Sequence, residues 1–227
     1  MTLLALALAP AIVIMMYIYI KDKYEREPIK FVLKNFGLGA SASIIITLII
    51  GLILKMIFPT ADPLSVGQQF LKAFVVVALV EEFSKYIIVR YYAQRNKEFD
   101  EPFDGIVYAV MVSMGFAALE NIMYVFQFGM ANGIVRAFTA VPAHATFGIL
   151  MGYFMGKAKF AATKKDTIRL NLTGLCTATI FHGAYDFFLF INFIPGISIG
   201  AFVSLVIGIL LSRKAIKKHQ ARSQFKH

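Results

Sequence analysis

The chain has 227 residues, of which 59% are hydrophobic and 16% are charged, and its mean hydropathy is +0.70. Water-soluble domains contain about 45–50% apolar and about 25% charged residues, so this composition excludes an ordinary soluble domain and predicts an integral membrane protein. The single cysteine, Cys176, excludes an internal disulfide framework and a zinc cluster built from cysteines, because each needs at least two thiols.

Seven apolar runs divide the chain, and each is close to the roughly 20 residues that a transmembrane helix needs. The first lacks a basic segment before it and is interpreted as a retained span. The second is long enough to be strongly tilted or broken near Gly51, and the seventh is short, so six to eight spans fit the pattern. The expected spans are Thr2–Ile20, Phe31–Phe58, Gly67–Arg90, Gly105–Phe128, Arg136–Gly156, Leu170–Phe193 and Ile197–Ser212.

The 23 Lys and Arg residues are concentrated in alternate connections between these runs. Most of them lie in Lys21–Lys34, Arg90–Lys97, Lys157–Arg169 and Arg213–Lys226. Because cytoplasmic loops are enriched in Lys and Arg, this predicts an external N-terminus and a cytoplasmic C-terminus. We therefore expect one all-α membrane domain over residues 1–227. The net charge of +10 is explained by topology and by anionic lipid at the cytoplasmic face, and no nucleic-acid partner is expected.

A few ionisable or strongly polar side chains lie inside the expected spans, where a charge costs at least about 2.5–3.5 kcal/mol. They are Glu81, Glu82, Lys85, Glu120, Asn121, His144, His182 and Asp186. With a rise of 1.5 Å per residue, those on four different spans lie roughly 14–22 Å from the cytoplasmic edge. The sequence therefore predicts a single polar layer near the middle of the membrane.

Helical spacing places several of these groups on shared faces. Lys85 is four residues after Glu81 and three after Glu82, so it is able to pair with either carboxylate. Asp186 is four residues after His182 and is expected to orient its imidazole. A stripe of small residues that lets helices approach closely shares a face with His144. Its members are Ala140, Gly148, Gly152 and Gly156.

Carboxylates and imidazoles buried together suit hydrolysis, proton relay or metal binding. In a hydrolase, a glutamate accepts a proton from water and histidines stabilise the oxyanion. A metal-dependent version would place His144, His182 and one of Glu81, Glu82 and Glu120 around zinc, although no HExxH motif occurs. The rival interpretation is a transporter that uses the same layer as a proton or ion relay. A scaffold whose polar groups only set helix packing is a further alternative.

Two other intramembrane protease patterns fit less well. The segment GASA at Gly39–Ala42 lacks one glycine of the serine-type motif, and Ser41 has no evident histidine partner. The pair Tyr185–Asp186 is typical of one aspartyl-protease motif, but the second motif, GxGD, is missing, and Asp104 lies instead in the sequence FDG.

Four segments in order resemble the PrsW family of bacterial intramembrane proteases. They are EEFSKY from Glu81, FDGIVYAVMVSMGFAALEN from Phe103, HATFGILMGY from His144 and FHGAYDF from Phe181, and YIKDKYEREP and MGKAKF extend the resemblance over most of the chain. The family is similar to the CAAX prenyl protease and abortive-infection superfamily. Relative to that superfamily, Lys85 stands at a shorter spacing and Glu120 replaces a histidine after Phe116, so His144 is a candidate for the missing imidazole.

The resemblance implies a multi-pass protease of the bacterial cell membrane that makes the first cut in a membrane-anchored anti-sigma factor during envelope stress. We interpret Glu81 or Glu82 as the group that activates water, with Glu81 favoured because Lys85 is its i,i+4 neighbour. His182 and His144 would polarise the scissile carbonyl, and Lys85, Glu120, Asn121 and Asp186 would hold these groups. A metal-free glutamic mechanism with no cofactor is favoured over a metal-dependent one.

Overall fold

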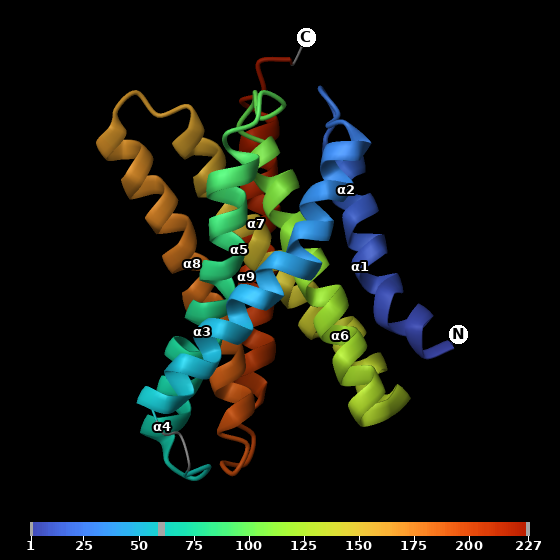
Figure 1. Cartoon of the computed structure of the whole chain (residues 1–227), viewed down its shortest axis with the longest axis vertical. Helices are drawn as coiled ribbons and strands as arrows, with labels where there is room; N and C mark the ends of the chain where they lie inside the picture. The colour runs from blue at the N-terminus through green and yellow to red at the C-terminus, as the bar shows by residue number, and fades with distance from the viewer. Residues whose placement is uncertain (1, 59–61, 226–227) are drawn as a thin grey trace.

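The computed structural model of the chain describes residues 2–58 and 62–225, and within them every regular element is helical (Figure 1). The helices join end to end into seven continuous segments. Their elements are α1 (Thr2–Lys21), α2 (Ile29–Leu38), η1 (Gly39–Ser43), α3 (Ile44–Ile57), α4 (Val66–Leu71), η2 (Lys72–Leu79), α5 (Val80–Ile88), η3 (Val89–Ala93), α6 (Asp104–Phe138), α7 (Ala140–Lys159), α8 (Lys164–Phe190) and α9 (Ile199–Gln220), where η marks π-helix.

Four stretches of the described residues are long and apolar enough to cross a membrane. They are Leu3–Lys21, Ile29–Ile57, Asp104–Lys159, which contains both α6 and α7, and Ile199–Gln220. Large apolar side chains point outward from α3 and α9, such as Met56 at 87% exposure, which is typical of a lipid-facing surface. The predicted all-helical membrane architecture is confirmed, while the number of seven spans stays a prediction.

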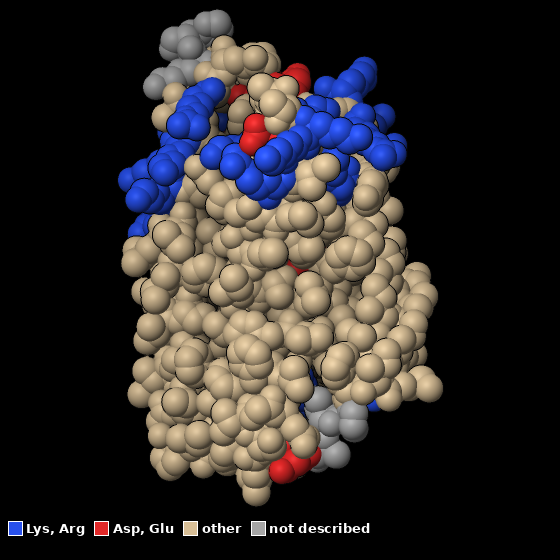
Figure 2. Space-filling view, turned by 90° about the vertical axis from the view of Figure 1, so that its left-hand side faces the viewer, with Lys and Arg blue, Asp and Glu red and all other residues tan. Residues whose placement is uncertain are grey.

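Lys and Arg gather at one end of the molecule, and its middle is almost free of surface charge (Figure 2). The α1–α2, α7–α8 and C-terminal segments all lie at this end (Figure 1). The alternating charge pattern thus corresponds to one physical end of the bundle. That this end faces the cytoplasm stays a prediction from the positive-inside rule.

The second segment contains a π-helical turn at η1 and no break at Gly51. An added Cβ at Gly51 would meet no atom within 4 Å, so this glycine faces open space and α3 continues through it. Of the two alternatives for this long run, a strong tilt or a break near Gly51, the structure contradicts the break. Gly39 is the position where a glycine is required, because a Cβ would lie 2.0 Å from the carbonyl oxygen of Val112 on α6.

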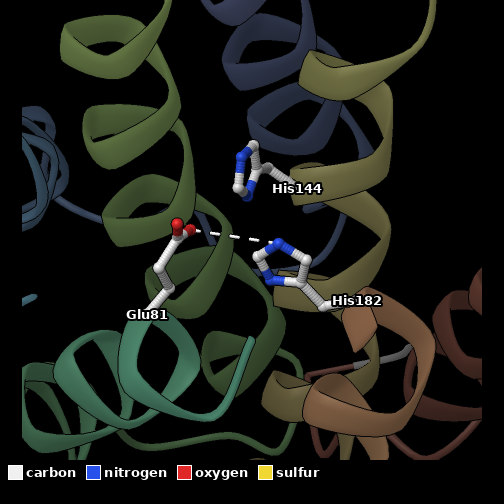
Figure 3. A group of neighbouring side chains, drawn as sticks. All are labelled: Glu81, His144 and His182. Atoms are coloured by element: carbon white, nitrogen blue, oxygen red, sulfur yellow. Dashed lines mark ion pairs between the residues drawn. The ribbon is translucent and has the colours of Figure 1, made fainter. Parts of the chain in front are cut away.

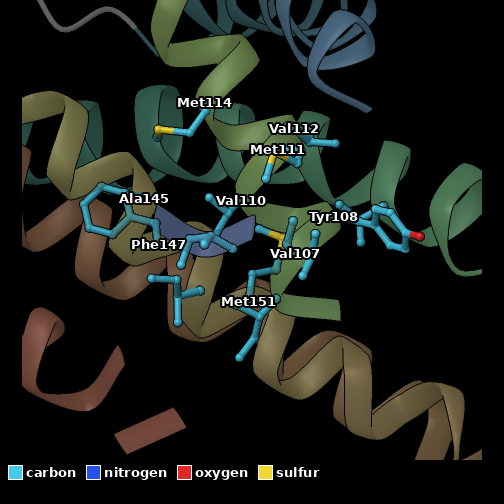
Figure 4. Packing of buried hydrophobic residues seen from close by; sticks show 14 of the residues in the cluster. Val107, Tyr108, Val110, Met111, Val112, Met114, Ala145, Phe147 and Met151 are labelled. Atoms are coloured by element: carbon cyan, nitrogen blue, oxygen red, sulfur yellow. The ribbon is translucent and has the colours of Figure 1, made fainter. Parts of the chain in front are cut away.

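The first half of α6 forms the centre of the bundle and is buried along almost its whole circumference (Figure 4). Helix α7 packs on it through the predicted stripe of small residues. A Cβ at Gly152 would lie 2.2 Å from the carbonyl oxygen of Gly105, and a Cβ at Gly148 would contact Ser113. The close approach of α6 and α7 positions His144, which belongs to the same face of α7.

Helix α6 is kinked at Gly129, whose backbone has φ 81° and ψ −173°, a conformation that glycine adopts without strain. The chain then forms a short helical stretch that ends at Phe138, and α7 begins at Ala140. Helix α7 thus begins four residues after the expected start of a span at Arg136. Arg136 lies after the kink, on a stretch that returns toward the middle of α6.

His219 is buried near the C-terminal end of α9. Its side chain is 1% exposed and its ring lies 4.5 Å from that of Tyr153. The cause is that α9 continues to Gln220, beyond the expected end at Ser212, and packs on α7. His227 lies outside the described residues.

Candidate active site

A cavity of about 530 Å³ lies among α5, α6, α7 and α8. Most of its wall is apolar, with Val76, Phe147 and Tyr185 among the lining residues. Five of the polar groups predicted from the sequence line it: Glu81, Glu120, His144, His182 and Asp186. Three cations, Lys55, Lys72 and Arg136, also line it. Figure 3 shows how Glu81, His144 and His182 point toward one another from three different helices. A membrane-embedded polar layer predicted from the sequence is thus one continuous site.

Glu82 is the central anchor of the site and does not line the cavity. Its side chain is 0% exposed, and its Oε1 atom accepts hydrogen bonds from Lys85 Nζ at 2.7 Å and from His182 Nδ1 at 2.9 Å. A buried carboxylate with two donors is held rigidly and is removed from substrate. Glu82 therefore positions Lys85 and His182.

Glu81 has the opposite environment, although it is the adjacent residue. It lines the cavity, and its Oε2 atom is 3.6 Å from Lys85 Nζ and 4.0 Å from His182 Nε2, without a hydrogen-bond partner among the described residues. A carboxylate oxygen with unused acceptor capacity beside a cavity is free to bind water or a metal ion. The sequence favoured Glu81 because of its i,i+4 spacing to Lys85, but Lys85 lies closer to Glu82, at 2.7 Å, than to Glu81, at 3.6 Å. What distinguishes the two acids in the structure is that Glu81 lines the cavity and Glu82 does not.

His182 is held by carboxylates at both ring nitrogens. Glu82 accepts at Nδ1, and Asp186 Oδ2 is 3.3 Å from Nε2, as the i,i+4 spacing predicted. The ring also stacks on Phe147, with centroids 4.8 Å apart and planes 15° from parallel. This arrangement suits an imidazole that presents N–H groups in a fixed orientation.

His144 connects Lys85 to Glu120. The Lys85 ammonium lies 3.2 Å from Nδ1, and Glu120 Oε2 lies 3.0 Å from Nε2. An ammonium has no acceptor, so Nδ1 accepts from Lys85 and Nε2–H donates to Glu120. The two imidazole centroids are 5.3 Å apart. Lys85 is also 4.1 Å above the ring of Phe116, which supports its burial.

Arg136 belongs to the site although the sequence analysis gave it no role. Its Nη2 donates to Glu120 Oε2 at 2.7 Å and its Nε donates to Asn121 Oδ1 at 2.9 Å. Asn121 in turn donates to the carbonyl oxygen of Ala7 at 3.0 Å, which ties α1 to this network. One signal was available: Arg136 is a lone cation in a connection that the charge pattern otherwise leaves empty.

The helix that carries the two glutamates is irregular on both sides. Helix α5 is preceded by the π-helix η2 and followed by η3, and π-helical segments are frequent at functional sites. Its other face is fixed by Ser84, whose hydroxyl contacts Ser43 at 2.6 Å and accepts from Thr47 at 2.9 Å. These bonds to η1 and α3 hold the glutamates toward the cavity.

Glu81, His144 and His182 also form a potential metal-binding set. One ligand atom from each residue lies within 4.8 Å of the other two. Two histidines and one carboxylate are a donor set of catalytic zinc sites, and the unpaired Glu81 Oε2 is a suitable ligand. The set is assembled from three helices, which explains why no local HExxH motif is present.

The fold and the site together define a helical membrane protein with a buried centre of carboxylates and histidines. Comparison with known proteins identifies the family. Residues 27–212 match the PrsW family, described as "PrsW family intramembrane metalloprotease", and the chain belongs to that family.

Relatives named "Protease PrsW" are similar to the chain over most of their length. The Geobacillus kaustophilus (strain HTA426) protein is 37% identical over 98% of this chain and 95% of its own. Those of Bacillus subtilis (strain 168) and Clostridioides difficile (strain 630) are 35% and 36% identical, and they are covered over 82% and 80% of their lengths. No solved structure matches the chain.

Proposed function

We propose that the chain is an intramembrane endopeptidase that hydrolyses a peptide bond in the cavity bounded by α5 to α8. The observation that carries this proposal is the convergence of Glu81, His144 and His182 on that cavity, where their ligand atoms lie within 4.8 Å of one another. The cavity is largely apolar around this centre, so the few polar groups act in a low-dielectric surrounding where they are most effective.

Glu81 activates the water in this proposal, because it is the member of the acidic pair that faces the cavity. It accepts the proton of the attacking water and later transfers it to the leaving amine. His182 directs an N–H toward the developing oxyanion and is kept in place by Glu82 and Asp186. His144 is oriented by Lys85 and Glu120, while Arg136 and Asn121 secure Glu120.

A metal-dependent form of the same reaction is favoured by the donor set and by the description of the family. Glu81, His144 and His182 would hold a divalent ion such as zinc, and Glu120 is the remaining cavity glutamate. A bound ion would polarise the scissile carbonyl and lower the pKa of water. Lys85 lies 3.2 Å from His144 Nδ1 and Glu120 lies 3.0 Å from Nε2, so this form requires one of these two partners to give up its contact to the ion.

Purified protein in lipid nanodiscs, treated with a strong chelator, separates the two forms. If cleavage is lost and returns with zinc, the metal-dependent form holds. Full activity with no bound metal by mass spectrometry supports the metal-free form. Retained cleavage in Glu81→Ala, Glu82→Ala and His182→Ala variants together would end the proposal of hydrolysis at this site.

The proposed substrate is a membrane-anchored anti-sigma factor that is cut on its extracytoplasmic side during envelope stress. The cavity is lined by Lys55 near the end of α3, Lys72 directly after α4 and Phe190 at the end of α8. These parts of the helices lie at the end of the bundle opposite the Lys- and Arg-rich one (Figure 1), which supports an extracytoplasmic approach. Mass spectrometry of the products from an anchored anti-sigma substrate gives the cleaved bond. A cut on the cytoplasmic side would contradict this assignment.

A proton- or ion-coupled transporter that uses the same layer predicts a different result. It gives pH-dependent flux in proteoliposomes and no peptide product. Assaying both readouts on one preparation decides between transport and hydrolysis.

Anionic lipid is the proposed partner of the Lys- and Arg-rich end. A groove of about 940 Å³ between α1 and α9 is lined by Lys21, Lys23, Arg213, Lys214, Lys217 and Lys218, with Tyr17 and Leu210 beside them. Basic clusters next to apolar helices attract anionic head groups. Native mass spectrometry is expected to retain phosphatidylglycerol over phosphatidylcholine, and a variant with Lys214, Lys217 and Lys218 changed to Gln is expected to lose that preference.

A further inference from the structure

A second group of acids, two of them buried and one half-buried, lies outside the cavity at the Lys- and Arg-rich end. Glu25 and Glu27 come from the connection between α1 and α2, and Asp104 is the first residue of α6. One carboxylate oxygen from each lies within 4.8 Å of the other two. The two segments, YEREP and FDG, are parts of the sequence that the proposed reaction does not use.

Two of these carboxylates are fixed through one oxygen while the other oxygen is left without a partner. Asp104 Oδ2 accepts the backbone N–H groups of Asp100 and Glu101, each at 2.7 Å, and Glu27 Oε2 accepts the hydroxyl of Tyr108. Asp104 Oδ1 and Glu27 Oε1 are buried and have no hydrogen-bond partner among the described residues. Glu27 and Asp104 are 1% and 0% exposed.

Asp22 adds a further acid beside this group. It is 1% exposed, and neither of its carboxylate oxygens has a hydrogen-bond partner in the described part of the chain. No ion pair found among residues 2–58 and 62–225 includes Asp22, Glu25, Glu27 or Asp104. The acids therefore lack a compensating positive charge.

We propose that Glu25, Glu27 and Asp104 bind a hard divalent cation, of the class of Mg²⁺ and Ca²⁺. The donor set consists entirely of carboxylate oxygens, which these cations prefer, and it contains none of the nitrogen or sulfur ligands that select zinc. The prearranged free oxygens of Glu27 and Asp104 are two ligands, Glu25 supplies a third, and water completes the shell. The ion would connect the α1–α2 segment to the start of α6.

Terbium luminescence tests the site on the full chain in a nonionic detergent. Tb³⁺ prefers oxygen ligands and is excited through nearby tyrosine, and the chain contains 10 Tyr and no Trp. Tyr108, which contacts Glu27, is the expected donor. We expect saturable emission that Mg²⁺ or Ca²⁺ displaces, and the more effective competitor identifies the preferred ion. Emission is expected to fall at least about tenfold in the near-isosteric variants Glu27→Gln and Asp104→Asn.

Two control variants separate this site from others. His182→Ala alters the candidate active site, and Asp166→Asn removes an acid in the α7–α8 connection that pairs with Arg169 at 2.9 Å. Both are expected to keep the full emission. Equal emission from wild type, Glu27→Gln and Asp104→Asn, or no saturable emission from wild type, would overturn the proposal.

If Glu27→Gln or Asp104→Asn folds poorly, the melting temperature (Tm) of the wild type with and without the ion tests the same site. At about 100 times its dissociation constant, the preferred ion is expected to raise the Tm of the wild type by roughly 5 °C. Glu25→Gln, which changes the most accessible of the three ligands, is expected to lose most of that rise. A Tm independent of both ions in the wild type would contradict the site.

Discussion

The molecule contains two groups of buried or half-buried acids that differ in their basic partners. In and around the cavity, Glu81, Glu82, Glu120 and Asp186 lie among Lys85, Arg136 and two imidazoles. At the Lys- and Arg-rich end, Asp22, Glu25, Glu27 and Asp104 have no basic partner among the described residues. The same residue types are therefore used for two kinds of site.

The two groups of acids therefore obtain their counter-charges from different sources, one from the protein and the other from solution. A charge inside the bilayer needs a fixed partner in the protein, because neither water nor ions are freely available there. An acid group near the membrane surface is able to take its counter-charge from solution. We therefore expect the cavity network to be preformed and the surface-end group to depend on solution conditions.

The largest expected effect is on activity and distinguishes Glu81 from Glu82 within the first group. Glu81→Gln removes the carboxylate that faces the cavity and breaks no short hydrogen bond, so cleavage is expected to fall by about 10²–10⁴-fold with little change in Tm. A reporter substrate in nanodiscs measures the rate, and differential scanning fluorimetry measures Tm. Unchanged cleavage would transfer the role of base to another group.

Glu82→Gln is expected to act mainly on stability. It leaves the Lys85 ammonium without its 2.7 Å partner and removes the carboxylate that holds His182. Breaking one partner of a buried ion pair costs about 3–5 kcal/mol. The double variant Glu82→Gln with Lys85→Met is the matched control, because it removes both charges and is expected to recover part of the loss. A wild-type Tm in the single variant contradicts the anchoring role.

Arg136→Met tests the contact that the sequence did not predict. It removes both hydrogen bonds that hold Glu120 and Asn121, so His144 loses its fixed orientation. Cleavage is expected to fall by about 10–100-fold, as when the outer partners of a metal-ligating or catalytic histidine are removed. Arg136→Lys is expected to recover little of the activity, because a single ammonium does not reproduce the two hydrogen bonds that the guanidinium donates to Glu120 and Asn121. Full activity in Arg136→Met would show that Glu120 is held without it.

Glu27→Gln gives the smallest expected effect and contrasts directly with Glu82→Gln. With divalent cations removed by chelator, the substitution breaks no ion pair and is expected to change the free energy of unfolding by less than about 1 kcal/mol. Asp166→Asn is the control, because it breaks an exposed ion pair with Arg169 and is expected to change the free energy of unfolding very little. A loss as large as that in Glu82→Gln would mean that the second group has a basic partner after all.

Much of the fold could be predicted from the sequence, because apolar length and charge placement report directly on a membrane helix. Helical rise alone also placed Glu81, Glu120, His144 and His182 at similar depth, and the structure brings them together. Rotation about the helix axes could not be predicted, and it decides that Glu81 faces the cavity while Glu82 does not.

Two further features depend on contacts between distant segments. Arg136 reaches Glu120 only because the backbone of Gly129 reverses the path of α6, and no local pattern reports that reversal. The acids of the second group are separated by more than 70 positions along the chain. Their proximity follows from how the α1–α2 segment packs on the start of α6, which neither charge counting nor periodicity describes.

The π-helix η2 determines in which direction about the helix axis the side chains before and after it point, relative to one another. In a regular α-helix, Lys72 and Glu81 would be 2.5 turns apart and would point in opposite directions. Both line the cavity, because the wider π turns rotate less per residue and bring the two side chains round to one side. A single-residue deletion after Lys72 within η2 would therefore keep every site residue but change the angle about the helix axis between Lys72 and Glu81.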